Sequence, residues 1–171
     1  FISSVGNDEN GKEMLTHLNS IGFNTKHIYI DNKYPTGTVQ VKLKENKAPQ
    51  FTISHECSYD YITLNDSTKR LIEKETDLLY FGTLSTRSDI SRDTIQSLFR
   101  KPQLKYFCDL NLRHSFYTKE LIEKTLLTTN VLKINADELN SLKQFFDLEQ
   151  SNNGAIEQLI KEYDIDLIGL T

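Results

Sequence analysis

Three polar residues at alternate positions follow one of the most apolar runs of the chain. The run Leu104–Cys108 leads into Asp109, Asn111 and Arg113, which are separated from one another by leucines. On extended backbone, alternate side chains point to the same side, so these polar groups would converge at a strand end. One interpretation is an internal Asp–Arg ion pair that holds a loop. The other is a binding site in which Arg113 donates to a sugar hydroxyl, a carboxylate or a phosphate.

A second polar cluster, Asn135-Ala136-Asp137-Glu138, follows the apolar run Val131–Ile134. An Asn followed three residues later by Glu is the capping-box pattern that begins a helix. The same pair could also face a cleft and hold a hydrated Mg²⁺, with Glu138 as the carboxylate and Asn135 acting through water. Mg²⁺ keeps several of its waters and needs few protein carboxylates. The two interpretations are compatible, because a capped helix start is also a rigid platform.

A third strand end is predicted at Gly82, where Ser85, Thr86 and Arg87 follow. These residues could line the same cleft, although loops are generally polar. The net charge of −4 means that an anionic substrate would need local basic residues. Arg87, Arg92 and Arg113 are the candidates.

Several other kinds of site are not indicated. The four histidines, His17, His27, His55 and His114, show no metal-ligand spacing. The sequence contains no GxSxG, no Walker-type phosphate loop and no GxGxxG, which argues against an α/β-hydrolase, a P-loop kinase and a dinucleotide-binding dehydrogenase.

Composition narrows the class of protein further. The 171 residues are 37% hydrophobic, and charges of both signs are scattered along the chain, so we expect no nucleic-acid partner. No apolar run approaches membrane-spanning length, and Cys57 and Cys108 read as reduced thiols, Cys108 in the core. We expect a cytoplasmic protein without a membrane partner. The chain starts and stops on strand-like segments, Phe1-Ile2 and DLIGLT, so we also expect a piece of a longer protein.

Apolar runs that alternate with amphipathic segments must position these clusters. Leu104 to Glu138 forms a β-α-β unit, and open α/β sheets bind ligands at the carboxyl ends of their strands. The alternation predicts a parallel sheet covered by helices on both faces. The expected strands are 1–6, 26–30, 77–82, 104–108, 131–134 and 166–171, and the expected helices are 13–20, 67–75, 89–100 (stopped by Pro102), 118–129, 136–146 and 153–163.

The stretch TGTVQVKL, residues 36–43, has a different pattern. Val39, Val41 and Leu43 alternate with polar residues, which predicts a half-exposed antiparallel strand. The turn ENKAP follows, and FTIS, residues 51–54, is expected to pair back. With no helix between these strands, a small β-flap at about 34–64 is favoured over an ordinary surface hairpin.

Five segments, in chain order, are SVGNDENG, PTGTVQV, YFGTLSTR, FCDLNLR and NADE. Together they resemble the ribokinase-like, or PfkB, carbohydrate kinases, and are most similar to the bacterial fructokinase-type members. They are similar to the family's VGxDxxG, its lid strand, FGSLxxR, FDxNxR and NxxE, respectively. The resemblance implies a three-layer α/β sandwich with a parallel-rich sheet and a β-lid. It also implies phosphoryl transfer from ATP, with Mg²⁺, to a primary hydroxyl of a sugar.

Residue roles carried over from the family are also expectations. Asn135 and Glu138 match the residues that organise Mg²⁺ and the triphosphate, and Thr171 aligns with a strand-end Thr near the nucleotide. Asn111 and Arg113, beside Asp109, match positions near the sugar and the transferring phosphate. On the lid, Thr38 and Gln40 offer neutral hydrogen-bonding groups, with Lys42 further out, which favours a neutral, fructose-like sugar. Such lids often pair between two subunits, so a homodimer is also implied.

The resemblance is incomplete at both ends. The family's amino-terminal sugar-binding segment and its carboxyl-terminal GxGD motif have no counterpart here. We therefore expect the middle of a larger kinase, with the general-base Asp beyond Thr171 and no activity in this chain alone. The alternatives that stay open are a 2-keto-3-deoxygluconate kinase, a nucleoside kinase, and a non-catalytic module that binds sugar or nucleotide.

Overall fold

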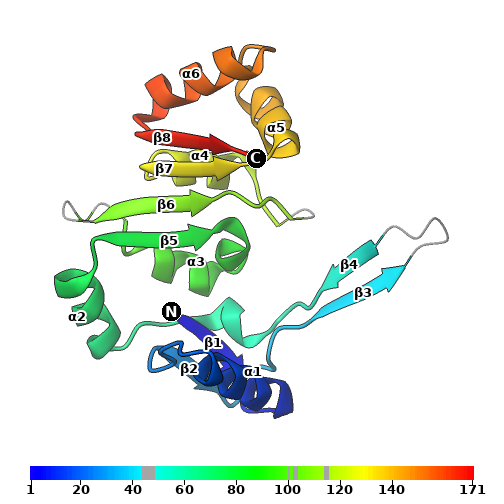
Figure 1. Cartoon of the computed structure of the whole chain (residues 1–171), viewed down its shortest axis with the longest axis vertical. Coiled ribbons are helices and arrows are strands. Elements are labelled where there is room, and N and C mark those ends of the chain that lie inside the picture. Colours follow the sequence, from blue (N-terminus) through cyan, green and yellow to red (C-terminus); the bar gives the residue numbers. More distant parts are fainter. Residues whose placement is uncertain (44–48, 100, 102–103, 114–115) are drawn as a thin grey trace. The chain divides into compact units, whose positions relative to one another are not determined.

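A computed structural model describes residues 1–43, 49–99, 101, 104–113 and 116–171 (Figure 1). The chain divides into two compact units. Unit 1 comprises residues 1–68 with 88–94, and unit 2 comprises residues 69–87 with 95–171. Each unit is described separately. Within the described residues, no helix is long and apolar enough to cross a membrane.

Unit 1 is built on two parallel strands, β1 (Ser3–Gly6) and β2 (Ile28–Asp31), joined by helix α1 (Glu9–Ser20). The helix begins four residues before the expected start at Glu13, because the side chain of Asp8 caps it. Asp8 Oδ1 accepts the backbone N–H of Gly11 at 2.9 Å, which satisfies one of the free donors of the first turn. The expected helix stop at Gly22 is confirmed, since Gly22 adopts a φ of 82°.

The β3–β4 hairpin of unit 1 consists of β3 (Val39–Leu43) and β4 (Pro49–Ile53), which pair antiparallel (Figure 1). The predicted pairing of residues 51–54 with the preceding strand is confirmed for the part that lies in β4. The expected turn ENKAP falls largely outside the described residues, and its Pro49 belongs to β4. A short 3₁₀ helix, η1 (Ser58–Tyr61), follows the hairpin.

Unit 2 contains a four-stranded sheet in the order β5-β6-β7-β8, and every neighbouring pair is parallel. The strands are β5 (Leu78–Gly82), β6 (Lys105–Asp109), β7 (Val131–Ile134) and β8 (Leu167–Leu170). The other elements are η2 (Thr83–Thr86), α4 (Lys119–Leu126), α5 (Ala136–Phe146) and α6 (Asn152–Tyr163), with α2 (Asp66–Glu75) and α3 (Asp89–Gln96) crossing the boundary between the units.

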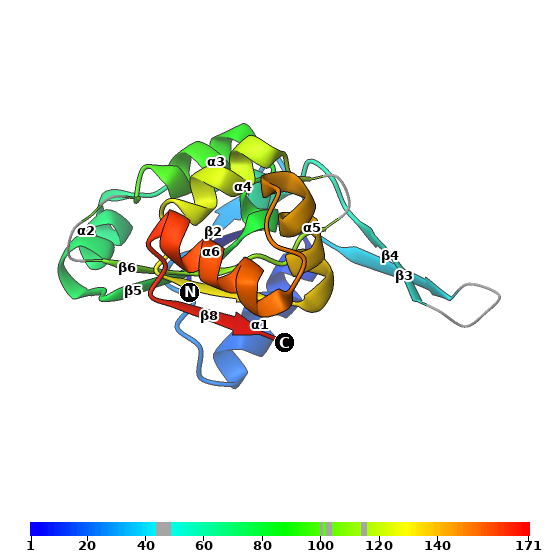
Figure 2. The same ribbon diagram turned by 90° about the horizontal axis from the view of Figure 1, so that it is seen from above.

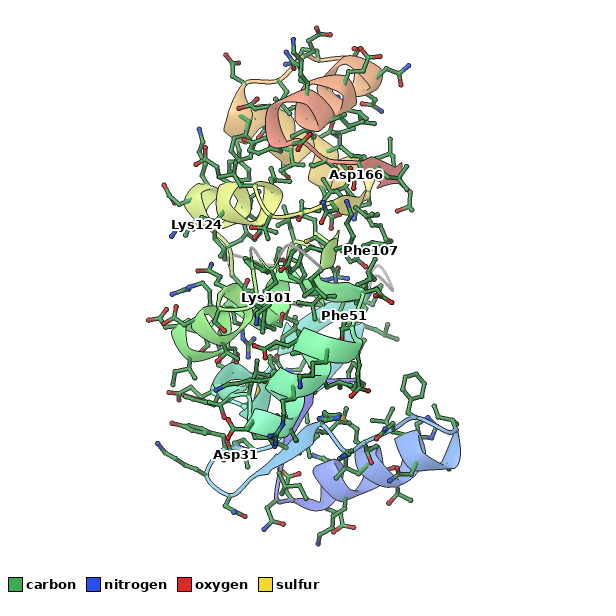
Figure 3. The ribbon with its side chains drawn as sticks, turned by 90° about the vertical axis from the view of Figure 1, so that its left-hand side faces the viewer. Asp31, Phe51, Lys101, Phe107, Lys124 and Asp166 are labelled. Carbon is green, nitrogen blue, oxygen red and sulfur yellow. The ribbon has the colours of Figure 1, made fainter. Side chains whose placement is uncertain are left out.

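The described helices of unit 2 bury one face of this sheet. In β6, Tyr106, Cys108 and the following Leu110 are buried, and they alternate with Lys105, Phe107 and Asp109 on the other face. Figure 3 shows Lys124 of α4 and Phe107 of β6 on opposite sides of the sheet, and Figure 2 shows α4 on one side of it. The core under the helices includes Ile122, Leu126, Leu132, Ile134, Leu139, Leu142 and Leu159.

The expectation of helices on both faces is therefore met on only one face by the described residues of unit 2. Leu78, Tyr80 and Leu167 on the other face are 47%, 59% and 60% exposed. The topology explains this. Each connection leads from one strand to its next neighbour, always in the same direction across the sheet. Right-handed connections that all run in one direction place their helices on the same face of the sheet.

Most predicted elements are observed with small shifts at their ends. The strand at 131–134 and the helix at 136–146 have the predicted bounds. Helix α3 ends at Gln96, not at Arg100, and the proposed stop at Pro102 lies outside the described residues, as does His114. Neither Cys57 nor Cys108 forms a disulfide, and both side chains are buried, so the predicted core position of Cys108 is confirmed.

Candidate functional site

Glu138 connects two neighbouring strand ends of unit 2. Its Oε2 accepts the backbone N–H of Asn135 at 2.9 Å, and its Oε1 accepts the backbone N–H of Leu112 at 3.1 Å. Asn135 follows β7, whereas Leu112 lies in the segment after β6. The side chain is buried at 6% exposure, so these two charge-assisted bonds form away from bulk water. One carboxylate therefore fixes the position of the segment after β6 relative to the start of α5.

The predicted capping box is confirmed at the start of α5. The Asn135 side chain accepts the backbone N–H of Glu138 at 2.8 Å, which completes the reciprocal pair. Helix α5 then ends at Asp147, which adopts the left-handed conformation with φ 52°. The capped amino-terminal turn presents backbone N–H groups and the positive end of the helix dipole at the carboxyl edge of the sheet.

Asp109 takes part in a different ion pair from the predicted Asp–Arg pair. It lies opposite Lys133 in the β6–β7 register, and Lys133 Nζ donates to both of its carboxylate oxygens at 3.0 and 3.1 Å. Tyr80 OH on β5 donates to Asp109 Oδ2 at 3.1 Å. The Asp109 carboxylate is thus held by two side chains on the exposed face of the sheet, and Arg113 is exposed on the loop.

These contacts change proton affinities in a definite direction. The hydrogen bond from Lys133 to Asp109 raises the pKa of the Lys133 ammonium, because the charged form is favoured. Burial raises the pKa of the Tyr80 phenol, and its bond to Asp109 adds to that shift. Lys133 is therefore a fixed positive charge at neutral pH.

The backbone at Asn111 corrects the expected alternation of Asp109, Asn111 and Arg113. Strand β6 ends at Asp109, and Asn111 adopts a left-handed conformation with φ 42°. An Asn tolerates this region better than most residues do. The segment therefore turns after Asp109, and the three side chains do not share one side of an extended strand. The turn brings the Leu112 N–H to Glu138.

Thr171 lies at the end of β8, beside the end of β7. Its backbone N–H donates to the Ile134 carbonyl at 3.0 Å, and its hydroxyl lies 3.5 Å from the same oxygen. Asn135 follows Ile134 directly, so Thr171 and the start of α5 are neighbours at the same edge of the sheet. The predicted nucleotide-side residues Asn135, Glu138 and Thr171 are therefore close together.

The loop after β5 uses its predicted polar groups internally. Ser85 Oγ donates to the Gly82 carbonyl at 2.7 Å, and Thr86 Oγ1 donates to the Thr83 carbonyl at 2.7 Å. Arg87 stacks on Phe116, with its Cζ 4.9 Å from the ring centroid. Thr83, which was not singled out from the sequence, donates to the Leu110 carbonyl at 2.6 Å and joins the ends of β5 and β6.

The lid residues Thr38 and Gln40 belong to unit 1. Thr38 N–H donates to Ser54 Oγ at 2.8 Å, which closes the base of the hairpin, and Gln40 is exposed on β3. Arg92, another basic candidate, forms an ion pair with Asp89 within the same unit. These three residues belong to unit 1, whereas the strand-end cluster belongs to unit 2.

The donors at the strand ends suit one kind of Mg²⁺ site. No group of three or more His, Cys, Asp or Glu side chains gathers as a metal cluster among the described residues. Each Glu138 oxygen already accepts one backbone N–H and keeps one lone pair. Such a carboxylate fits an ion that retains most of its waters, with Asn135 alongside, and does not fit an ion held directly by several carboxylates.

Sequence and structural comparisons identify the family. Residues 1–164 match the family described as pfkB family carbohydrate kinase. The chain belongs to this family. It is 29% identical over 147 residues to a putative sugar kinase of Pyrococcus horikoshii, which covers 81% of this chain and 46% of that protein. It is 28% identical over 150 residues to a chloroplastic fructokinase-like protein of Arabidopsis thaliana, which covers 83% of this chain and 24% of that protein.

Solved structures of the family share the fold. A crystal structure of the Pyrococcus horikoshii sugar kinase in complex with ATP superposes with a TM-score of 0.75 at 27% identity, covering 84% of this chain and 49% of that one. Fructokinase from Xylella fastidiosa gives a TM-score of 0.80 at 16% identity, covering 100% of this chain and 54% of that one, and shows the fold alone. The chain therefore spans about half the length of these structures. The expected α/β fold of the ribokinase-like kinases is confirmed.

Proposed function

We propose that this chain is part of a kinase that transfers a phosphoryl group from ATP to a primary hydroxyl of a sugar. The observation that carries this proposal is the Glu138 bridge, which joins the segment after β6 to the start of α5 at 3.1 and 2.9 Å. Phosphoryl transfer depends on positioning and charge neutralisation rather than on protein-centred covalent chemistry. A bridge that holds two ligand-facing segments in register supplies such positioning. The family membership of residues 1–164 supports the same conclusion.

Each side of the bridge has a proposed task. Asn111 and Arg113 lie on the segment after β6 and would orient the sugar and the phosphoryl group that moves. Asn135, Glu138 and Thr171 lie at the ends of β7 and β8 and would hold the triphosphate side. The amino terminus of α5 favours negative charge there. When bound, Mg²⁺ would neutralise phosphate charge, with Glu138 and Asn135 holding its water shell.

We propose a neutral, fructose-like sugar as the acceptor. Thr38 and Gln40 supply uncharged donors and acceptors on the polar face of the hairpin, and the charged Lys42 lies further along β3. An acidic sugar such as 2-keto-3-deoxygluconate would call for basic side chains at that position. A nucleoside acceptor remains the other alternative within the family.

We also propose that these 171 residues do not complete the reaction alone. A general base needs a carboxylate within reach of the hydroxyl and ready to accept its proton. At the described strand ends of unit 2, Asp109 is held by Lys133 and Tyr80, and Glu138 accepts two backbone N–H groups. The family's general-base Asp would come from a part of the fold outside this chain.

Two measurements test these proposals. Isothermal titration of this polypeptide with Mg²⁺·ATP should show binding that falls at least about tenfold in Asn135→Ala, because a ligand-side amide is lost. Asp137→Asn, exposed on the same helical turn, is the matched control. A coupled assay with ATP and fructose, 2-keto-3-deoxygluconate or adenosine should show no turnover by this chain.

The outcomes separate the alternatives. Turnover with fructose would contradict the proposed inactivity of the chain and support the kinase. Turnover only with another acceptor would change the sugar assignment. Absence of ATP binding would contradict the proposed nucleotide side of the site. A non-catalytic binding module would bind ATP or sugar but would show no turnover even within the longest natural polypeptide that contains these residues.

We propose, finally, that the hairpin pairs between two subunits. Val39, Val41 and Leu43 are 55%, 56% and 73% exposed, and Phe51, opposite Val41, is 49% exposed. An apolar strip of this kind on a two-stranded ribbon is costly in water, and a second copy would bury it. Sedimentation of Val41→Lys should show a shift to monomer. Gln40→Lys, on the opposite face, should leave the dimer intact, and a monomeric wild-type protein would contradict the proposal.

A further inference from the structure

We propose that Asp8 is a positioning residue that sets the orientation of the β3–β4 hairpin by holding its first root, Thr36. The role in catalysis rests on the proposed function, in which the hairpin carries the sugar contacts Thr38 and Gln40. The structural claim concerns unit 1 alone and stands on the contacts described next.

Asp8 uses both carboxylate oxygens on a small network at the amino terminus of α1. Oδ2 accepts the backbone N–H of Thr36 at 2.8 Å. Oδ1 accepts the Thr36 hydroxyl at 2.6 Å and the backbone N–H of Gly11 at 2.9 Å. The Thr36 hydroxyl in turn accepts the backbone N–H of Gly6 at 2.8 Å. A helix cap would need only the bond to Gly11, so the two bonds to Thr36 are additional to capping.

The network is closely packed around glycine. A Cβ on Gly6 would lie 2.5 Å from Thr36 N and 2.6 Å from Asp8 Oδ2. A Cβ on Gly11 would collide with the Gly6 carbonyl oxygen and lie 2.9 Å from the Thr36 hydroxyl. Thr36 itself is 8% exposed. The VGxDxxG segment and the PTG segment are therefore in direct contact. Asp8 and Thr36 contact each other there, and the two glycines leave the space that these contacts need.

The hairpin has few other restraints. All five residues of β3 and four of the five in β4 are exposed, and Ile53 is the buried one. A ribbon with so little packing takes its orientation from its roots. The second root is the segment that follows β4, and Ser58 holds it. The Ser58 N–H donates to the Pro35 carbonyl at 2.8 Å, and its hydroxyl donates to the Ser4 carbonyl at 2.9 Å. The segments before and after the hairpin are thus both bonded to β1, at Gly6 and at Ser4.

The charge on Asp8 strengthens the attachment. The hydrogen bonds from the Thr36 hydroxyl and N–H, followed by that from Gly11, hold the pKa of Asp8 below its ordinary value. Asp8 is therefore ionised at neutral pH, and its bonds to Thr36 are charge-assisted. An Asn in its place would turn its N–H₂ group toward the backbone N–H of either Thr36 or Gly11, and a backbone N–H cannot accept a hydrogen bond.

The test measures hairpin orientation directly. Spin labels on Glu13→Cys in α1 and Lys42→Cys in β3 report the distance between helix and hairpin, since the native Cys57 and Cys108 are buried. The distance distribution should be narrow in the parent and broaden roughly twofold in Thr36→Val, which removes the hydroxyl and keeps the helix cap. Asp8→Asn should broaden it as well, and Thr36→Ser, which restores the hydroxyl, should return the narrow distribution.

Two results would overturn the proposal. One is a distribution in folded Thr36→Val as narrow as that of the parent. The other is unfolding of both Thr36→Val and Asp8→Asn, because Asp8 would then determine folding rather than orientation. The cap variant Thr118→Ala, at the start of α4 in unit 2, is the control for loss of a helix cap and should leave the distribution unchanged. The measurement needs no turnover, so its failure is distinct from failure of the kinase proposal.

Discussion

The carboxylate of Glu138 accepts the backbone N–H of Leu112, 26 residues earlier in the chain, at 3.1 Å. The bond joins the turn after β6 to the first turn of α5, and the left-handed backbone at Asn111 directs the Leu112 N–H toward it. A helix cap and a loop anchor are thus combined in one buried side chain. The motif NxxE therefore has a structural role in this chain, whether or not a ligand is bound.

Replacing Glu138 by Gln is expected to lower the free energy of unfolding by about 2 kcal/mol, because hydrogen bonds to a buried charged group are disrupted. Urea unfolding followed by circular dichroism measures this loss. The exposed neighbour Asp137→Asn should cost less than about 1 kcal/mol, the size of a helix-dipole effect. Equal losses in the two variants would show that the link to Leu112 adds nothing to stability. Hydrogen exchange at the Leu112 amide should accelerate only in Glu138→Gln.

Local patterns were sufficient to predict α5. Asn135 and Glu138 mark its start, and the apolar positions Leu139 and Leu142 define its buried face, so the predicted bounds match those observed. The start of α1 was missed because NDENG has the composition of a turn, whereas Asp8 is in fact a helix cap. A cap residue and a turn residue have the same chemistry, and only the following contacts distinguish them.

The contacts between strand ends could not be predicted from the sequence in the same way. Lys133 lies within an apolar run, and its partner Asp109 is 24 residues away. Their meeting depends on the β6–β7 register, which places the two residues opposite each other. An Asp–Arg pair was one interpretation of the pattern, because Asp109 and Arg113 are near in sequence. In the structure the backbone is left-handed at Asn111, and Lys133 forms the ion pair with Asp109.

The pair of Lys133 and Asp109 predicts a pH-dependent contribution to stability. The folded-state pKa of Lys133 is raised, so its contribution is fully present below the unfolded value of about 10.4 and is lost as pH rises through the folded pKa. Lys133→Met should remove the part of the stability loss at alkaline pH that comes from deprotonation of Lys133. The measurement compares urea unfolding of parent and variant from about pH 8 to about pH 11.5.

The Lys133 experiment has two controls. Asp109→Asn should remove the same part of the alkaline loss, and the double variant should add no more. Lys124→Met, on the exposed face of α4, deletes a lysine without touching the pair. If Lys133→Met and Lys124→Met have the same alkaline profile, the bond to Asp109 does not contribute.

Both cysteines are expected to be unreactive in the folded protein. Cys57 and Cys108 are each 0% exposed, and burial raises the pKa of the Cys108 thiol. Ellman's reagent should label the native chain at least roughly a hundredfold more slowly than the urea-unfolded chain, because reaction requires opening. Lys42→Cys, on the exposed β3, should gain one rapidly labelled thiol. Rapid labelling of the parent would contradict the core position of the two native thiols.

The Asp8 network predicts a loss of stability at acid pH, whereas the Lys133 pair predicts a loss of stability at alkaline pH. The folded-state pKa of Asp8 is lowered by Thr36 and Gly11, so its contribution is present above the unfolded value of about 3.9 and is lost as pH falls through the folded pKa. Asp8→Asn should therefore weaken unit 1 at neutral pH and reduce the loss of stability on acidification. Thr36→Val should reduce the same loss, because it removes the largest cause of the lowered pKa. Urea unfolding from about pH 6 to about pH 2.5 measures the effect, with Asp137→Asn as the control. If the free energy of unfolding falls equally steeply with acidification in the parent, Asp8→Asn and Thr36→Val, other carboxylates account for the loss.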